Sequence, residues 1–171
     1  PEIVSKSQNV IAKLLENLAL LEIRDLVIPC VDQSSLRDQD NLDRFINNIK
    51  PIIELANKNK INLSLETDLN PELFSQLLNF LPYKCITVNY DTGNSASLGY
   101  DPLEEFKYYG DRISDIHIKD RKLNSGSVIL PNTANTSSLV IFILNYFNDL
   151  IDFSMNLTTF KVLPDSRFFI S

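Results

Sequence analysis

The sequence contains no run of lysine and arginine, and its 171 residues carry a net charge of −6. Nucleic-acid-binding proteins rely on basic patches for their phosphate contacts, so this charge balance argues against that class. An anionic substrate would have to be met by a few local cations or by helix N-termini. We therefore expect no nucleic-acid partner.

Long hydrophobic runs are also missing. The most apolar stretch, residues 138–151, is interrupted by Asn145, Asn148 and Asp149, and it is too short to span a bilayer. The first residues show neither the basic region nor the apolar core of a signal peptide. We therefore expect no membrane segment and a cytoplasmic protein.

Cysteine is scarce, because only Cys30 and Cys85 are present, each inside an apolar, strand-like run. Such residues are typical small core residues of proteins in a reducing compartment. The sequence leaves a disulfide between them open.

Apolar runs do alternate regularly with helical patterns. The hydrophobic share of 44% is ample for one buried core, so we expect a single domain over residues 1–171. Strands are predicted near residues 24–31, 61–66, 84–90, 112–119 and 153–160, and helices near residues 5–19 and 40–57 and after Asn70 and Asp101. This alternation predicts an α/β fold with a parallel sheet and right-handed crossovers. The nearly continuous apolar run at 24–31 is typical of a strand buried on both faces.

Several local signals set the expected boundaries of the helices. Asn70 and Asp101 are predicted N-caps, each followed by a proline at the first helical position. Pro51 should kink or divide the helix in which it lies. Residues 92–100, TGNSASLGY, are expected to form a loop.

Three polar residues stand at the ends of successive predicted strands. Glu66 and Asp91 are 25 residues apart, and Asp91 and His117, the single histidine, are 26 apart. This step is the length of one strand–helix unit, so the three side chains should meet at the carboxyl edge of the sheet, where α/β barrels keep their chemistry. Two carboxylates and one imidazole gathered there could hold a divalent metal.

Each of these residues also has a simpler explanation. Glu66 could be solvated or could cap the following loop, and Asp91 before Thr-Gly-Asn is a good turn former. A single histidine between two isoleucines is often a core or strand-edge residue. The residues alone leave these alternatives open.

Three segments carry a resemblance to a known family: LETD (65–68), VNYDTGNSASLGYDP (88–102) and DIHIKDRK (115–122). They resemble the xylose-isomerase-like barrel superfamily, and within it the sugar-phosphate isomerases and epimerases of the hexulose/ribulose-phosphate 3-epimerase kind. The resemblance implies a TIM (β/α)8 barrel whose fourth to eighth strands match those predicted here. We therefore expect a partial barrel of about five parallel β/α units that lacks the first units at its N-terminal side. The length agrees, because a full barrel has about 250 residues.

The resemblance implies a metal site. By that analogy Glu66 is a metal ligand and also the catalytic acid/base, and Asp91 and His117 are further ligands. One divalent ion is implied, with Mn, Co, Mg and Zn as the candidates.

The resemblance also implies residues that contact the substrate, a sugar or sugar phosphate. Asn94 stands where relatives face the metal site and the substrate. Lys119 and Arg121 fall in the loop after the ligand histidine, where the family contacts the sugar or its phosphate.

The sequence departs from the family pattern in two places. Relatives carry a further glutamate, the second acid/base, at the end of the last strand, whereas no carboxylate lies here between Asp152 and Asp165. Their glycine-rich phosphate-binding segment reads LPNTANT at residues 130–136 and contains no glycine.

The expected function is that of a metal-dependent sugar or sugar-phosphate isomerase or epimerase, which removes a proton next to a carbonyl and passes through an enediolate. The alternative is a catalytically impaired or truncated relative that acts as a non-enzymatic interaction domain. Exposed barrel edges would then favour a homodimer. The apurinic endonuclease branch of the superfamily uses more metals and more histidines, so a single histidine argues against it.

Overall fold

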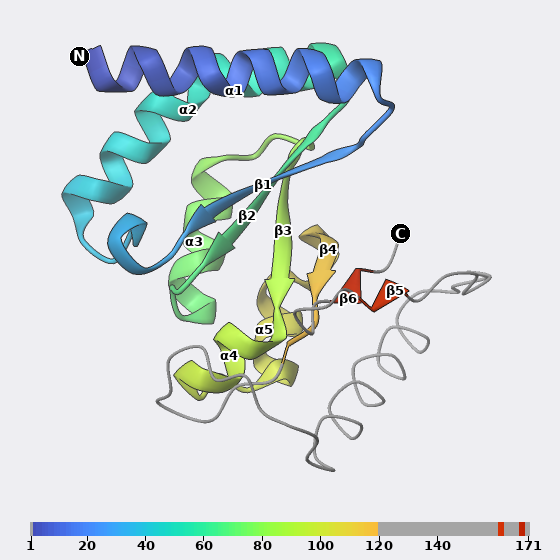
Figure 1. Ribbon diagram of the computed structural model, residues 1–171. Helices are drawn as coiled ribbons and strands as arrows, with labels where there is room; N and C mark the ends of the chain where they lie inside the picture. The colour runs from blue at the N-terminus through green and yellow to red at the C-terminus, as the bar shows by residue number, and fades with distance from the viewer. Residues whose placement is uncertain (1, 120–160, 163–167, 170–171) are drawn as a thin grey trace. The chain divides into compact units, whose positions relative to one another are not determined.

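The computed structural model describes residues 2–119, 161–162 and 168–169 (Figure 1). The chain divides into two compact units. Of the described residues, the first contains those up to Tyr90 together with residues 100–115, and the second contains residues 91–99 and those from Ile116 onward.

Four strands form one sheet in the order β1-β2-β3-β4, namely β1 (Asp25–Cys30), β2 (Asn62–Thr67), β3 (Ile86–Asp91) and β4 (Ile113–His117). β1 pairs with β2 in parallel, with Leu26 opposite Leu63, and β2 pairs with β3 in parallel, with Leu65 opposite Val88. The predicted α/β fold with a parallel sheet is confirmed. Each of these strands lies within two residues of its expected bounds.

The predicted helices are present, one before β1 and the others between successive strands. They are α1 (Glu2–Leu20), α2 (Gln39–Asn59), α3 (Pro71–Phe80) and α5 (Pro102–Tyr109), with short 3-10 turns at Asp32–Ser34 and Gly110–Arg112. The Asn70 side chain accepts a hydrogen bond from the Leu73 N–H at 2.9 Å, and the Asp101 side chain accepts one from Leu103. Both predicted N-caps are therefore confirmed.

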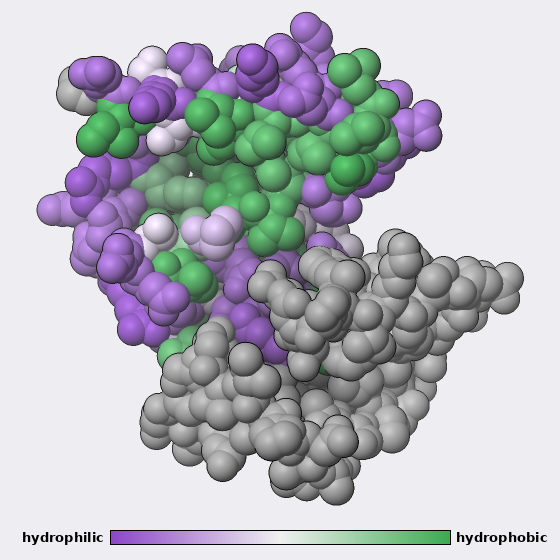
Figure 2. Space-filling model, in the orientation of Figure 1, coloured by the Kyte–Doolittle hydropathy of each residue, from purple (hydrophilic) through white to green (hydrophobic). Residues whose placement is uncertain are grey.

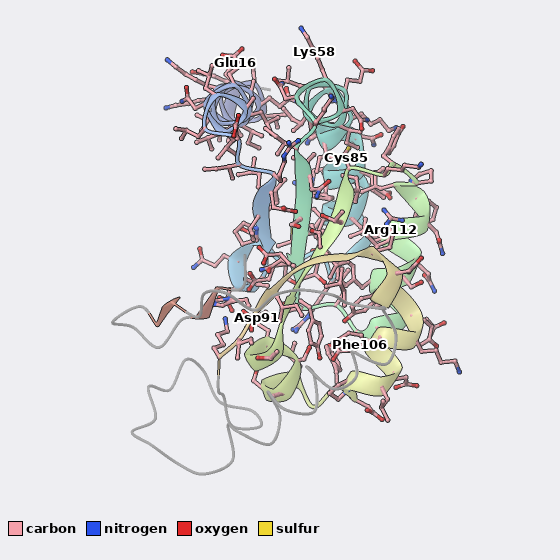
Figure 3. The ribbon with its side chains drawn as sticks, turned by 90° about the vertical axis from the view of Figure 1, so that its right-hand side faces the viewer. Glu16, Lys58, Cys85, Asp91, Phe106 and Arg112 are labelled. Atoms are coloured by element: carbon pink, nitrogen blue, oxygen red, sulfur yellow. The ribbon has the colours of Figure 1, made fainter. Side chains whose placement is uncertain are left out.

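The hydrophobic core lies between one face of the sheet and helices α2, α3 and α5, which lie on the same side of the strands in Figure 3. Leu63, Leu65 and Ile86 on that face are fully buried. Because side chains alternate along a strand, the opposite face carries the intervening residues, which are largely polar on β2 and β3: Asn62, Ser64, Glu66, Thr87 and Asn89. Polar groups are thus collected on the face of the sheet away from the helices.

The expected loop at residues 92–100 is wrong. Thr92–Leu98 form a short helix, α4, which begins directly after β3. Asp91 is its N-cap, since its Oδ1 atom accepts the Asn94 N–H at 2.8 Å. Gly99 ends the helix in the left-handed region, at φ 75°. Recognising Asp91 as an N-cap and Gly99 as a C-cap would have predicted this helix.

Pro51 does not divide the helix in which it lies. α2 continues through it from Gln39 to Asn59, although Figure 1 shows the helix changing direction along its length. Proline removes one backbone donor and crowds the preceding turn, and a bend relieves this crowding without ending the helix.

β1 is not buried on both faces, contrary to the sequence prediction. Val27 is 37% exposed and Pro29 is also exposed. Within the described sheet β1 is an edge strand with a single partner, β2. The apolar run therefore covers the core with one face only.

Cys30 and Cys85 are buried and not joined to each other. Burial, and then the charges of Asp68 and Glu66, raise the pKa of the Cys30 thiol to about 12. Burial also raises the pKa of Cys85. Both are core residues as predicted, and neither is a nucleophile at neutral pH.

The C-terminal part adds β5 (Lys161–Val162) and β6 (Phe168–Phe169), a short antiparallel ladder that the sequence did not predict. The strand predicted at 153–160, the segment LPNTANT and Arg121 lie outside the described residues. No helix in the described part of the chain has the length and apolar character needed to cross a bilayer.

Candidate metal centre

Glu66 is the next-to-last residue of β2. Its Oε2 atom accepts a hydrogen bond from the Asn89 side-chain amide at 2.9 Å. Because Leu65 lies opposite Val88, Glu66 and Asn89 are neighbours on the same face of the sheet. The carboxylate is half-buried, and this amide fixes its orientation.

Asp91 is the last residue of β3 and is only 4% exposed. Figure 3 shows it at one end of β3, with Cys85 near the other. It stands two residues after Asn89, so the alternation of the strand directs both side chains to the same face. Its Oδ1 atom is occupied by the cap of α4.

The second oxygen of Asp91 lies against two nitrogen groups. The Nδ1 atom of His117, the last residue of β4, lies 2.9 Å from Asp91 Oδ2. The Lys119 ammonium group forms an ion pair with the same oxygen. A single buried carboxylate is thus the meeting point of an imidazole and an ammonium group.

These contacts determine the charge of Asp91. Burial alone would raise the pKa of its carboxyl, but hydrogen bonds from His117 and Lys119, the charge of Lys119 and the Asn94 N–H outweigh it and hold the pKa at about 2. Asp91 is therefore an anion throughout the physiological range, as a metal ligand must be.

Glu66, Asp91 and His117 each offer one ligand atom, and these atoms lie within 4.8 Å of one another. No other such group of histidine, cysteine, aspartate and glutamate is found among the described residues. The three residues are those that the sequence predicted to meet. Two carboxylate oxygens and one imidazole nitrogen form a donor set that fits Mn, Mg, Co or Zn, and three ligands leave positions open for substrate.

The residues predicted to contact substrate differ in placement. Asn94 is 9% exposed and lies in the first turn of α4, where its backbone binds Asp91. Lys119 is held against Asp91. Arg121 lies outside the described residues. Their roles toward a substrate stay predictions.

Two residues at the site were missed by the sequence analysis. Asn89, 5% exposed, positions Glu66. Thr92, 2% exposed, donates to the Lys119 carbonyl at 3.0 Å and accepts the Lys119 N–H at 3.1 Å. Asn89 could have been found, because it is a polar residue inside an apolar strand, two positions from Asp91. Thr92 gave no signal beyond following Asp91.

Comparison with known proteins supplies the family. No curated protein matches the chain. The family model described as xylose isomerase-like TIM barrel matches residues 1–138, which is most of the sequence and includes all four strands of the parallel sheet. The chain belongs to the xylose isomerase-like TIM barrel family.

Proposed function

We propose that this protein is a metal-dependent isomerase or epimerase of sugars or sugar phosphates. The observation that carries the proposal is the group formed by Glu66, Asp91 and His117, whose ligand atoms lie within 4.8 Å of one another. Membership of the xylose isomerase-like family supports the same class of chemistry. The three residues would hold one divalent ion.

The reaction removes a proton from a carbon next to a carbonyl group. A divalent ion held by Glu66, Asp91 and His117 would supply the positive charge that stabilises the resulting enediolate. Glu66 is the proposed base, because its carboxylate is half-buried and is oriented by the Asn89 amide. Asn94, Lys119 and Arg121 are the proposed contacts to the sugar or its phosphate.

The number of bases favours isomerisation over epimerisation. Aldose–ketose isomerisation needs one base that carries a proton between neighbouring carbons, and Glu66 supplies one. Epimerisation at one carbon needs a second group on the opposite face, and the sequence between Asp152 and Asp165 has no carboxylate to provide it.

Proton exchange with solvent tests this proposal. The protein is loaded with Mn²⁺ and incubated in D₂O with a panel of ketoses and ketose phosphates, and deuterium uptake next to the carbonyl is followed by NMR. Uptake should require the metal and should stop on chelation. Glu66→Gln should lower the rate at least about 100-fold, the usual contribution of a positioned base.

Glu72→Gln is the matched control, because Glu72 is an exposed glutamate in the first turn of α3. It should exchange protons at the wild-type rate. The enzymatic proposal fails if the Mn²⁺-loaded protein exchanges no proton with any member of the panel.

A second candidate function, self-association, is favoured by a separate observation. Large hydrophobic side chains are exposed on α1, on the segment after it and on β1, and we call this set the apolar patch: Ile3, Val10, Leu14, Leu20, Leu21, Ile23 and Val27. Figure 2 shows hydrophobic residues gathered over this region. A soluble domain rarely exposes such a contiguous surface without a partner, and β1 is an edge strand that can pair with a second copy.

Leu14→Lys should therefore convert a dimer to a monomer, which light scattering coupled to size-exclusion chromatography measures directly. Leu73→Lys is the control, since Leu73 on α3 is equally exposed at 43% but lies outside the apolar patch. A wild-type protein that stays monomeric at every concentration contradicts this candidate.

A further inference from the structure

The side chain of Lys119 shares an oxygen with the proposed metal site. Its ammonium group contacts Asp91 Oδ2, the same atom that faces His117 Nδ1 at 2.9 Å. The Asp91 side chain is 2% exposed and the Lys119 side chain 22%. The ion pair is thus largely removed from solvent, where charges interact more strongly than at the surface.

The other oxygen of Asp91 already has a structural partner. Its Oδ1 atom is committed to the Asn94 N–H at the start of α4. Oδ2 is the oxygen that faces His117, so a cation bound by Asp91 and His117 together would lie against it, where the Lys119 ammonium group already forms an ion pair. Lysine carries donors only and cannot serve as a ligand beside the ion while it is charged. The two positive charges would repel each other across one oxygen atom, which favours departure of the ammonium group when the ion binds.

The local structure lets the Lys119 side chain leave while its backbone stays. Thr92 holds the Lys119 N–H and carbonyl with one hydroxyl group. The stem of the side chain passes directly over Gly93, where an added Cβ atom would lie 3.1 Å from Lys119 Cε and closer still to its Cγ. The absence of a side chain at Gly93 therefore leaves room for the stem of Lys119 to reach Asp91. The same flexible stem can rotate away from Asp91.

We propose that Lys119 is the counter-ion of Asp91 in the metal-free protein and that a divalent ion bound by Asp91 and His117 displaces its ammonium group from Asp91. This inference rests on the proposed metal site and adds a positioning role for Lys119. Metal loading then exposes a cation that can bind an anionic sugar, so the metal and the anion strengthen each other's binding.

Calorimetric titration with Mn²⁺ tests the displacement. Lys119→Met keeps the stem and removes the competing charge, so it should bind Mn²⁺ about tenfold more tightly, within the usual range of coupling between sites. Lys84→Met is the matched control, because Lys84 is an exposed lysine and its loss changes the net charge equally. It should bind Mn²⁺ like the wild type.

Thermal unfolding of the metal-free proteins provides a second readout. Lys119→Met should melt at a lower temperature than the wild type, because it leaves Asp91 without its ammonium partner, and Mn²⁺ should remove the difference. Unchanged or weaker Mn²⁺ binding by Lys119→Met, while His117→Ala loses the metal, overturns the role of Lys119 and leaves the metal site standing. Undiminished binding by both His117→Ala and Glu66→Gln overturns the metal site itself.

Discussion

His117→Ala is expected to weaken Mn²⁺ binding at least about 100-fold, because loss of even an outer hydrogen-bond partner of a metal ligand costs about 10–100-fold in affinity. His117 supplies the single nitrogen of the proposed donor set. Without the imidazole, only Glu66 and Asp91 would hold the ion, and the Lys119 ammonium group would compete for Asp91. Metal content after purification and calorimetric titration both measure this loss.

The control for this prediction is Asp111→Asn, which removes an exposed carboxylate from the turn before β4. It should leave the affinity for Mn²⁺ unchanged. If His117→Ala retains the metal at wild-type affinity, the ion is bound elsewhere and the catalytic proposal loses its basis.

The second large effect is on stability and concerns Glu105 in α5, which is 2% exposed. Its Oε2 atom accepts the Tyr90 hydroxyl at 2.9 Å and its Oε1 atom accepts the Tyr109 hydroxyl at 2.7 Å. Burial and the charge of Glu105 raise the pKa of Tyr109, so this hydroxyl remains a donor. Two aromatic contacts enclose the group, with Phe74 4.9 Å from Tyr109 and Phe106 5.1 Å from Tyr90 between ring centroids.

Glu105→Leu should lower the free energy of unfolding by about 2–4 kcal/mol, because each buried donor left without its acceptor costs about 1–3 kcal/mol. Leucine fills the space but leaves two buried hydroxyl groups without this acceptor. Urea unfolding followed by circular dichroism measures the change.

Glu104→Leu provides the comparison, because Glu104 precedes Glu105 in the same helix and is exposed. Its effect should stay within about 0.5 kcal/mol, as for most surface substitutions. Equal effects of the two substitutions would show that the tyrosine network contributes nothing beyond helix propensity.

Much of this architecture was predictable because it depends on signals close together in the sequence. The N-caps at Asn70 and Asp101, each followed by proline, define the starts of α3 and α5. The near-constant step from Glu66 to Asp91 to His117 predicted that three strand ends would meet, and their ligand atoms do lie within 4.8 Å. A parallel sheet turns equal spacing along the chain into proximity in space.

What escaped prediction depends on side chains that are distant in sequence. The contact of Lys119 with Asp91 spans 28 residues and requires the absence of a side chain at Gly93. The hydrogen bond from Asn89 to Glu66 depends on the register between β2 and β3. Neither can be read from periodicity, which reports the face of a strand but not its neighbour. The helix α4 was missed for a different reason. Gly93 and Asn94 are typical of turns, and this signal was given more weight than the capping role of Asp91.

The carboxylate of Asp91 divides two tasks between its two oxygens. One oxygen starts α4 through the Asn94 N–H, and the other faces the imidazole and the ammonium group. A longer acid at this position would disturb both tasks together, so the start of α4 and the binding of cations cannot be altered independently. The two oxygens share one carbon atom, so a group bound at Oδ2 also influences the Oδ1 hydrogen bond that begins α4.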